Sequence, residues 1–188
     1  MKKILLLLFF FSSTASASLI YPSYPCHDHS LYLSSGIVHP FQISWISPIQ
    51  TGDVRDSVSL FRLNLIYGES HNVSGFDLGL VNRVWGNLHG VEIGFSNVVV
   101  GDGGLLQLGL YNGVNQNFSG LQIGLCNYVE KDYSGVQIGL ANYSEHHRGL
   151  QIGILNITYQ LEGVQIGLMN VYSCSPCCNV LPFLNVGW

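Results

Sequence analysis

The chain has 188 residues, of which 47% are hydrophobic and only 10% are charged, and its formal net charge is −4 at pH 7. This length allows one domain and excludes a multidomain enzyme, while the apolar fraction excludes a disordered chain. The net negative charge disfavours binding to nucleic acid, and the low charge content means that Ser, Asn, Gln, Gly and Tyr cover much of the surface.

Residues 1–17 have the order of a secretory signal peptide: two lysines, an apolar run over 4–11, and Ala-Ser-Ala at 15–17 before the predicted cleavage site. The apolar run is far shorter than the roughly 20 residues that span a bilayer as a helix. The mature chain is therefore expected to begin at Ser18 and to be exported. Cys26 lies too far from that site to be acylated as in a bacterial lipoprotein.

Residues 18–57 are expected to form an N-terminal cap segment. This segment contains Cys26-His27-Asp28-His29, whose side chains are of the types that bind transition metals. Their spacing in an irregular segment does not bring three ligands to one point, so no metal site is predicted. His146 and His147 are adjacent, would point to opposite faces of a strand, and are expected to be solvated.

Residues 58–172 repeat one eight-residue phrase, as in GLQIGLCN from Gly120, with a period of 15 and later 14 residues. A degenerate copy, LFRLNLIY, begins at Leu60. In it, Asn64 stands where the inner glycine belongs. The inner glycines of the seven clear copies are Gly79, Gly94, Gly109, Gly124, Gly139, Gly153 and Gly167.

Apolar residues alternate with small or polar residues inside each phrase, as Leu121, Ile123 and Leu125 alternate with Gln122 and Gly124. This period of two predicts a β-strand with one apolar face. The apolar face is expected to fill the interior, and the Gln- and Gly-lined face to be exposed.

Most phrases begin with a second glycine, here called the outer glycine, as Gly120 begins GLQIGLCN. An apolar side chain stands two residues before it in most repeats. This side chain is also expected to face inward, since the outer glycine can adopt the positive φ of a corner. These side chains are Val73, Leu88, Phe118, Tyr133 and Leu161, with His147 in the same place in its repeat.

Two architectures fit the array. In a β-solenoid each repeat is one coil of 14–15 residues, parallel strands stack, and the repeat asparagines form a ladder at one corner. In an outer-membrane β-barrel of 8–10 strands, each phrase would span the membrane. The asparagines are Asn82, Asn97, Asn112, Asn127, Asn142, Asn156 and Asn170.

The connections favour the solenoid, because barrels alternate short turns with long loops whereas these connections are nearly equal in length. The alternation that ends at Trp188 is similar to the last strand of a barrel, although Pro182 interrupts it. The prediction is an all-β, single-domain solenoid, with the barrel as the alternative.

Residues 173–188 contain a cysteine-bearing insert and a final strand. Export favours disulfides, and the candidates are Cys26, Cys174, Cys177 and Cys178. The CxxC spacing of Cys174 and Cys177 could also serve a thiol–disulfide oxidoreductase, but such enzymes place it at a helix start in a βαβ unit, which this sequence lacks. Cys126 is expected to be a small filler.

The remaining polar motifs predict no catalytic site. The acidic residues are scattered, and those in the Gln position of their repeats, Asp77 and Glu92, are expected to be solvated like the others. Four glycosylation sequons, at Asn72, Asn117, Asn142 and Asn156, are interpreted as accidental, because two of them use repeat asparagines. We predict no enzymatic activity and no cofactor.

The phrases FQISWISP (41–48), FRLNLIYGESHNVSGFDLGLVN (61–82), the GxQIGLxN run and the closing LPFLNVGW together resemble a family of bacterial surface repeat-containing proteins. The resemblance covers residues from about 40 to the end, except the cysteine-bearing insert. It implies an exported envelope protein with no established biochemical activity.

The leading hypothesis is therefore an exported structural or interaction protein of the bacterial cell envelope, at the outer membrane or cell surface. Its Gln- and Gly-lined face and Tyr-rich loops are expected to form the binding surface. The expected partner is a protein, from the host or the bacterium, or another envelope component. The alternatives are a small outer-membrane barrel with a structural or narrow-pore role and, less favoured, the oxidoreductase.

Overall fold

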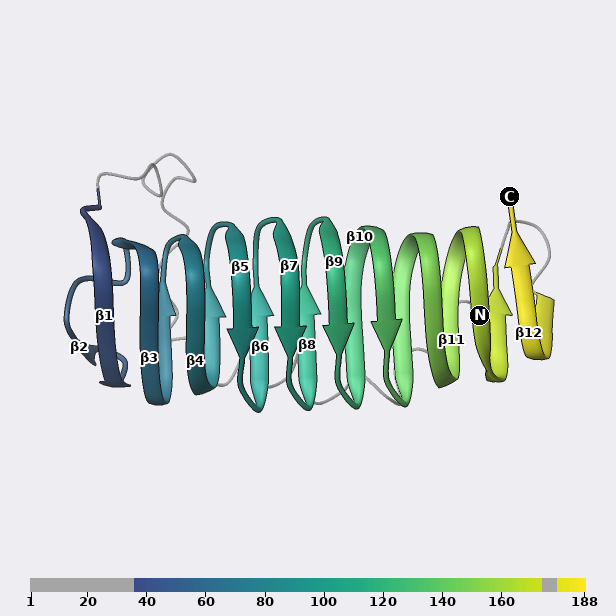
Figure 1. Cartoon of the computed structure of the whole chain (residues 1–188), viewed down its shortest axis with the longest axis horizontal. Coiled ribbons are helices and arrows are strands. Elements are labelled where there is room, and N and C mark those ends of the chain that lie inside the picture. Colours follow the sequence, from purple (N-terminus) through teal and green to yellow (C-terminus); the bar gives the residue numbers. More distant parts are fainter. Residues whose placement is uncertain (1–35, 174–178) are drawn as a thin grey trace, which may run out of the picture. The chain divides into compact units, whose positions relative to one another are not determined.

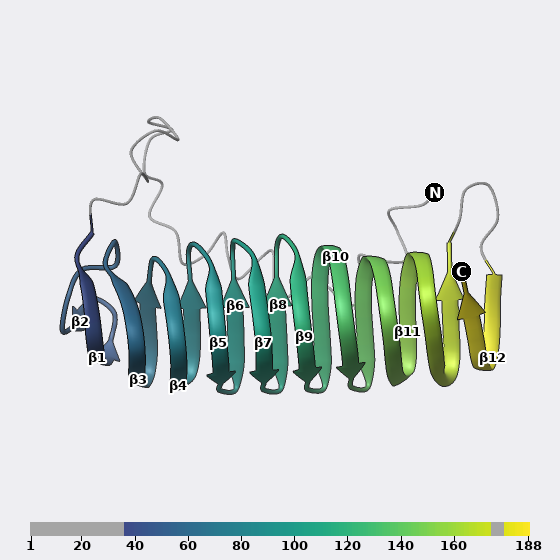
Figure 2. The same cartoon turned by 45° about the horizontal axis from the view of Figure 1, so that its top comes forward.

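The computed structural model describes residues 36–173 and 179–188, which form strands and connecting turns. The strands belong to one 12-stranded sheet that winds into stacked coils (Figures 1 and 2). They are β1 (Val38–Ile46), β2 (Ile49–Gln50), β3 (Ser57–Ser70), β4 (Val73–Val84), β5 (Leu88–Ile93), β6 (Ser96–Val99), β7 (Gly103–Leu108), β8 (Tyr111–Val114), β9 (Phe118–Ile123), β10 (Cys126–Ile138), β11 (Ala141–Tyr172) and β12 (Asn179–Gly187).

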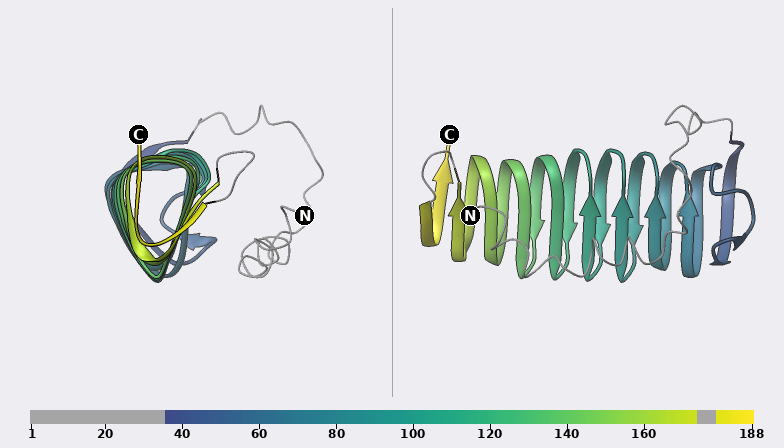
Figure 3. Two further views of the ribbon diagram at one scale, coloured as in Figure 1. Left: turned by 90° about the vertical axis from the view of Figure 1, so that its right-hand side faces the viewer. Right: turned by 180° about the vertical axis from the view of Figure 1, so that it is seen from behind.

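Neighbouring repeats pair in parallel and in register. Gln107 of β7 pairs with Gln122 of β9, and Asn97 of β6 pairs with Asn112 of β8, so each residue lies beside its equivalent in the next coil. Viewed along the stacking axis, the coils superpose as a triangle (Figure 3). The predicted solenoid is thus confirmed, and the repeats do not alternate in direction as the barrel alternative requires.

The predicted inside and outside of the repeat strands were wrong. The Gln column is fully buried, whereas Leu125 and Leu140 are 47% and 50% exposed on the outside. Asp77 and Glu92, which occupy the Gln position of their coils, are buried as well. The Gln-lined face is therefore the interior, and the aliphatic face is the surface.

The inner glycine explains how both amides of a repeat face inward. Gln122 and Asn127 are five residues apart, so simple alternation would place them on opposite faces. The chain turns a corner at Gly124 and Leu125, and the alternation restarts after it with Asn127 buried. The period of two therefore holds within each side of the triangle but not across its corner.

The apolar part of the interior lies elsewhere in the coil. The predicted second inward segment is confirmed, because Val73, Leu88, Phe118, Tyr133 and Leu161 are all buried. Its neighbour is a column of buried valines that comprises Val84, Val99, Val114 and Val129. The hydrophobic core is thus a pair of columns, separate from the aliphatic rows on the surface.

One residue breaks the rule for the outer corner. The outer glycines have positive φ, for example 140° at Gly120 and 139° at Gly135, as predicted. Leu105 occupies the same corner with φ of 91°. A side chain in this region costs about 1 kcal/mol or more, so this coil is locally strained.

The two ends of the stack differ. At the beginning, β1 pairs in parallel with β3 and so continues the ladder toward the N-terminus. At the other end, β12 pairs antiparallel with the last part of β11. Asn185 of β12 still points inward and extends the Gln column by one rung.

Candidate functional site: two amide ladders and an apolar edge

The repeat asparagines form an inward hydrogen-bonded ladder at the corner. Nδ2 of Asn97 donates to Oδ1 of Asn112 at 2.8 Å and to the carbonyl oxygen of Leu108 at 3.0 Å. The same pair of bonds recurs from Asn82 to Asn156, and Asn64 begins the series by donating to Asn82. Both amide hydrogens of each inner asparagine are used, which removes most of the cost of burying them.

The inner glycines make room for this ladder. A Cβ atom on Gly109 would lie 2.6 Å from the carbonyl oxygen of Gly94 and 2.7 Å from Nδ2 of Asn97. Both distances are below van der Waals contact. Glycine is therefore required here by the close approach of the asparagine amide, whereas among the glycines of the repeats φ is positive at the outer ones.

A second ladder runs through the Gln column with the opposite polarity. Nε2 of Gln122 donates to Oε1 of Gln107 at 2.7 Å, so the donors point toward the N-terminal coils, whereas the asparagine donors point toward the C-terminal coils. The later members, Gln137, Gln151 and Gln165, continue in the same direction, and Asn185 donates to Gln165. Such amide ladders are typical of parallel strands in register.

Between Gln42 of β1 and Gln107 the Gln column contains a charged cluster. Arg62 donates through Nε to Oδ1 of Asp77 at 2.8 Å and through its Nη2 to Oδ2, and both side chains are fully buried. Arg62 also donates to the carbonyl oxygen of Arg83 at 3.2 Å, and Asn64 donates to Asp77 at 2.9 Å. The ion pair is thus held by additional hydrogen bonds, as a buried pair requires.

Glu92 joins this cluster to the neutral ladder. Its Oε2 accepts a hydrogen bond of 2.7 Å from Gln107. Burial, reinforced by the nearby Asp77 carboxylate, raises the pKa of Glu92 to about 8. Glu92 is therefore protonated at neutral pH, which leaves the charge of Arg62 balanced by Asp77 alone.

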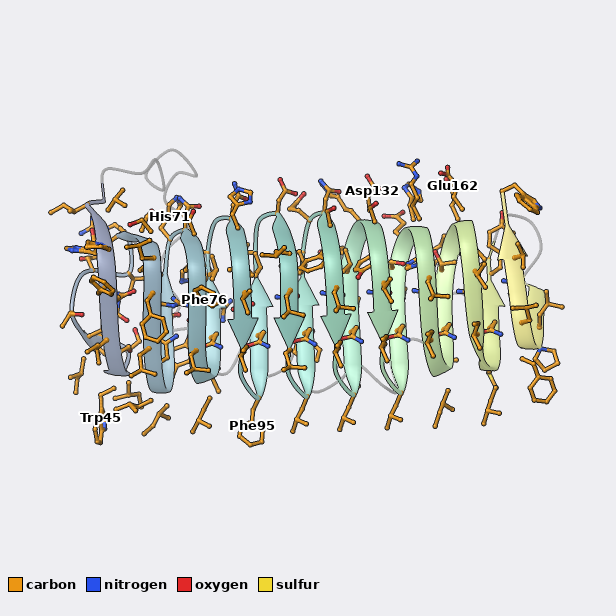
Figure 4. All side chains as sticks on the ribbon, viewed as in Figure 1. Trp45, His71, Phe76, Phe95, Asp132 and Glu162 are labelled. Carbon is orange, nitrogen blue, oxygen red and sulfur yellow. The ribbon has the colours of Figure 1, made fainter. Side chains whose placement is uncertain are left out.

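The surface carries an apolar edge that consists of three rows. Counted from the inner glycine of each repeat, the first row lies three residues before it, the second row one residue before it and the third row one residue after it. The first row contains Phe76, Val91, Leu106, Leu121, Val136, Leu150 and Val164; the second contains Leu78, Ile93, Leu108, Ile123, Ile138, Ile152 and Ile166; the third contains Leu80, Phe95, Leu110, Leu125, Leu140, Ile154 and Leu168. Every member is aliphatic or Phe. The third row lies on a corner of the triangle, where Phe95 projects outward (Figures 3 and 4).

Shallow grooves run along the apolar edge between the second and third rows. One has a volume of about 630 Å³, is floored by the glycines at 124, 139, 153 and 167, and is closed at its end by Phe183. Another, of about 570 Å³, lies over Gly79, Gly94 and Gly109. Exposed apolar surface of this extent normally marks an interaction site.

Charged side chains gather on the opposite edge, here called the polar edge, which comprises His71, Asp102, Asn117, Asp132, His146, Arg148 and Glu162. His71, Asp132 and Glu162 project away from Trp45 and Phe95 (Figure 4). Contacts across coils tie this edge together: Asp132 to His146 at 2.6 Å, and Arg148 to Glu162 at 2.7 Å. The solenoid is therefore amphipathic across its section.

The predicted histidine and cysteine features have different outcomes. His146 is exposed as expected. His147 is buried, which confirms its place in the second inward segment and contradicts the solvated interpretation, and it stacks on Tyr133 with ring centroids 5.0 Å apart. Burial lowers the pKa of His147 to about 4, so it is neutral. Cys126 is a free thiol that is exposed beside the corner.

Several predicted residues lie outside the described ranges: the proposed signal peptide, Cys26 to His29, and the cysteines Cys174, Cys177 and Cys178. Within the described ranges no group of His, Cys, Asp and Glu could hold a metal ion. The same ranges contain no helix of the length and hydropathy needed to cross a bilayer.

The inward asparagines agree with the predicted ladder, but the burial of the glutamines was missed because alternation does not say which face is inside. The signal was present in the residue types. The Asn position keeps its amide in all seven clear copies and the Gln position keeps it from Gln107 onward, whereas the rows of the apolar edge exchange Val, Leu, Ile and Phe freely. A ladder needs amides of equal length, and a surface row does not.

Comparison with protein-family models, with curated proteins and with solved structures found no match to this chain.

Proposed function

We propose that the protein is an exported component of the bacterial cell envelope that acts as a structural or interaction protein, and that the apolar edge is its interaction surface. The observation that carries this proposal is the third row of the apolar edge, which is exposed in every repeat and is flanked by two rows of half-buried or exposed apolar side chains. Monomeric soluble proteins rarely expose contiguous apolar patches this large. The N-terminal pattern of residues 1–17 supports export.

The interior of the solenoid supports a scaffold role. It contains apolar columns and two amide ladders, and the amides of the ladders bond to the neighbouring coil, as Asn97 and Gln122 do. Such a core holds the surface rows at a fixed spacing of about 4.8 Å, the distance between paired strands. The scaffold therefore offers a rigid and extended surface rather than a catalytic pocket.

Fractionation of the expressing bacterium tests the proposal. We expect a mature chain that begins at Ser18, is found in the envelope fraction and is released by detergent. The variant Ala15→Asp/Ala17→Asp should block processing. Leu125→Asp should shift the processed chain into the soluble periplasmic fraction, while Ser134→Asp on the polar edge should not. A chain that stays in the cytosol, or whose retention ignores Leu125, contradicts the proposal.

A further inference from the structure

We propose that the partner of the apolar edge is the hydrocarbon layer of a lipid membrane, into one leaflet of which the corner of the solenoid inserts while the polar edge remains in water. This inference rests on the proposed function and names its partner.

The chemistry of the rows is the first argument. A protein interface combines an apolar centre with a polar rim and about ten hydrogen bonds. The three rows offer no donor or acceptor side chain, since all their members are aliphatic or Phe. The strand amides beneath them already pair with the neighbouring coils, for example those of β7 with β9. Hydrocarbon has no hydrogen-bond donors or acceptors, so it matches this surface.

The shape of the edge is the second argument. The third row stands on a convex corner of the triangle, and the first two rows lie on the adjoining side, where Phe76 projects (Figures 3 and 4). A flat protein surface or a second copy would meet the third row along a narrow line, and one that packed on the first two rows would leave the third row in water. Fluid acyl chains can surround the corner and enter its shallow grooves.

The length of the edge is the third argument. The apolar rows continue beyond the repeats, through Phe41, Ile43 and Trp45 in β1 and through Phe183 and Leu184 in β12, all of which are more than half exposed. The contact thus runs along the entire stack of described coils. At about 4.8 Å per coil it is on the order of 40 Å long.

The distribution of charge gives the orientation. When the corner points into the leaflet, the carboxylates of Asp132 and Glu162 on the polar edge point into water (Figure 4). This is the arrangement of an interfacial amphipathic element, here built from strands instead of a helix. Because the chain is net negative, anionic lipid should not be needed for binding.

Vesicle flotation tests the inference. The purified mature chain, residues 18–188, is mixed with vesicles of neutral phosphatidylcholine, and the vesicle-bound fraction is measured. We expect binding that is insensitive to salt and is not increased by anionic lipid. The variant Leu110→Asp/Leu125→Asp/Leu140→Asp should lose binding by on the order of tenfold or more, because three exposed aliphatic side chains would become charged.

The matched control uses two charges on each edge: Leu125→Asp/Leu140→Asp is compared with Ser119→Asp/Ser134→Asp on the polar edge, which leaves the hydrogen bond from Asn117 to Asp102 in place. The polar-edge variant should bind within about twofold of the parent chain. Circular dichroism and melting of these variants establish that they are folded. If the triple Asp variant is unfolded, the milder Leu125→Asn is used, and its binding should still fall while that of Ser134→Asn stays unchanged.

A fluorescent probe reports insertion directly. In a chain with Cys26, Cys174, Cys177 and Cys178 changed to Ser, an environment-sensitive dye on Cys126, beside the corner, should shift to the blue with vesicles. The same dye on Ser134→Cys, with Cys126 also changed to Ser, should not shift.

The outcomes separate the two proposals. Edge-dependent flotation supports the lipid inference. No flotation, together with an oligomer that the triple Asp variant dissolves, overturns lipid as the partner but keeps the apolar edge as an interaction surface. No flotation and a monomer with or without the Asp changes overturns the lipid inference and counts against the proposed function as well.

Discussion

The first and the later coils solve the same interior problem with different chemistry. In the later coils, Gln107 to Gln165 form a neutral ladder in which each amide donates to the preceding one. In the first coils, the same column holds Arg62, Asp77 and the protonated Glu92. The neutral ladder requires only equal spacing, whereas the charged part also requires its charges to balance.

The difference follows from the direction of the ladder. Each glutamine of the ladder donates toward the N-terminal coils, so the ladder must end on a group that accepts, and Oε2 of Glu92 accepts from Gln107. In the coils that precede Glu92, the positive charge of Arg62 then balances the negative charge of the buried Asp77 carboxylate. The charged cluster is thus the terminus of the amide ladder, which explains why it lies in these coils.

The largest effect is expected from removing the cation. Arg62→Met leaves the Asp77 carboxylate buried and unpaired, which should lower the free energy of unfolding by about 3–5 kcal/mol. Urea denaturation at neutral pH measures it. Arg148→Met, which removes an exposed cation paired with Glu162, is the control and should change stability little. Equal losses in the two variants would contradict the burial of the Arg62 pair.

A break in the neutral ladder should cost less. Gln137→Leu keeps the volume but leaves Oε1 of Gln122 without its donor and leaves Nε2 of Gln151 with Oγ of Ser144 alone, at 3.3 Å. Buried groups left unpaired in this way should lower stability by about 2–4 kcal/mol. The same urea measurement compares it with Ile138→Gln, an outward change in the same strand, which should be nearly neutral. A larger loss for Ile138→Gln would restore the aliphatic interior that the alternation predicted.

The contrast between Gln137 and Ile138 also shows where sequence reasoning succeeds and where it stops. The repeat period, the parallel coils, the second inward segment and the positive φ of the outer glycines follow from spacing and residue type alone. The choice of inner face does not, because both faces of an alternating strand fit a coil, and the usual preference for burying Leu and Ile pointed the wrong way.

Asp77 and Glu92 show a related limit. In the sequence they look like two acids in a solvated position, because nothing nearby along the chain neutralises them. Only the register of the coils places Arg62 beside Asp77, 15 residues away, and Gln107 beside Glu92. The candidate surface was likewise assigned to the opposite face, since it depends on the same choice of interior.

The pH dependence of stability sharpens the contrast between the two ends. Burial raises the pKa of Glu92 from 4.5 to about 8, so between these values the folded chain keeps a proton that the unfolded chain has lost. Stability should therefore fall as pH rises from about 4.5 to about 8. Glu92→Gln extends the neutral ladder and removes this loss, which should stabilise the chain by about 1–3 kcal/mol at pH 8.

Urea unfolding from pH 5 to 9 measures this effect as a difference between the variant and the parent chain, so that the opposite contribution of His147 cancels. The pKa of His147 is lowered to about 4, and its neutral burial loses stability as pH falls below 6.5. Glu162→Gln, at an exposed position, is the control, and its free energy of unfolding should depend on pH as that of the parent chain does. A parallel profile for Glu92→Gln and the parent would show that Glu92 does not hold the proton.

The smallest effect is expected at the junction of the charged and neutral parts. Leu105 precedes Gln107, the first amide of the neutral ladder, and takes the outer corner with φ of 91°, where neighbouring coils use glycine. Since its side chain is 63% exposed, Leu105→Gly gives up little burial and relieves the backbone. It should raise the free energy of unfolding by about 1 kcal/mol.

Leu108→Gly, in the same strand but at negative φ, should lower the free energy of unfolding by a similar amount. A gain of stability in Leu105→Gly beside a loss in Leu108→Gly, in the same thermal or urea assay, supports strain at residue 105, and a loss of stability in both would mean that the corner carries no strain for glycine to relieve.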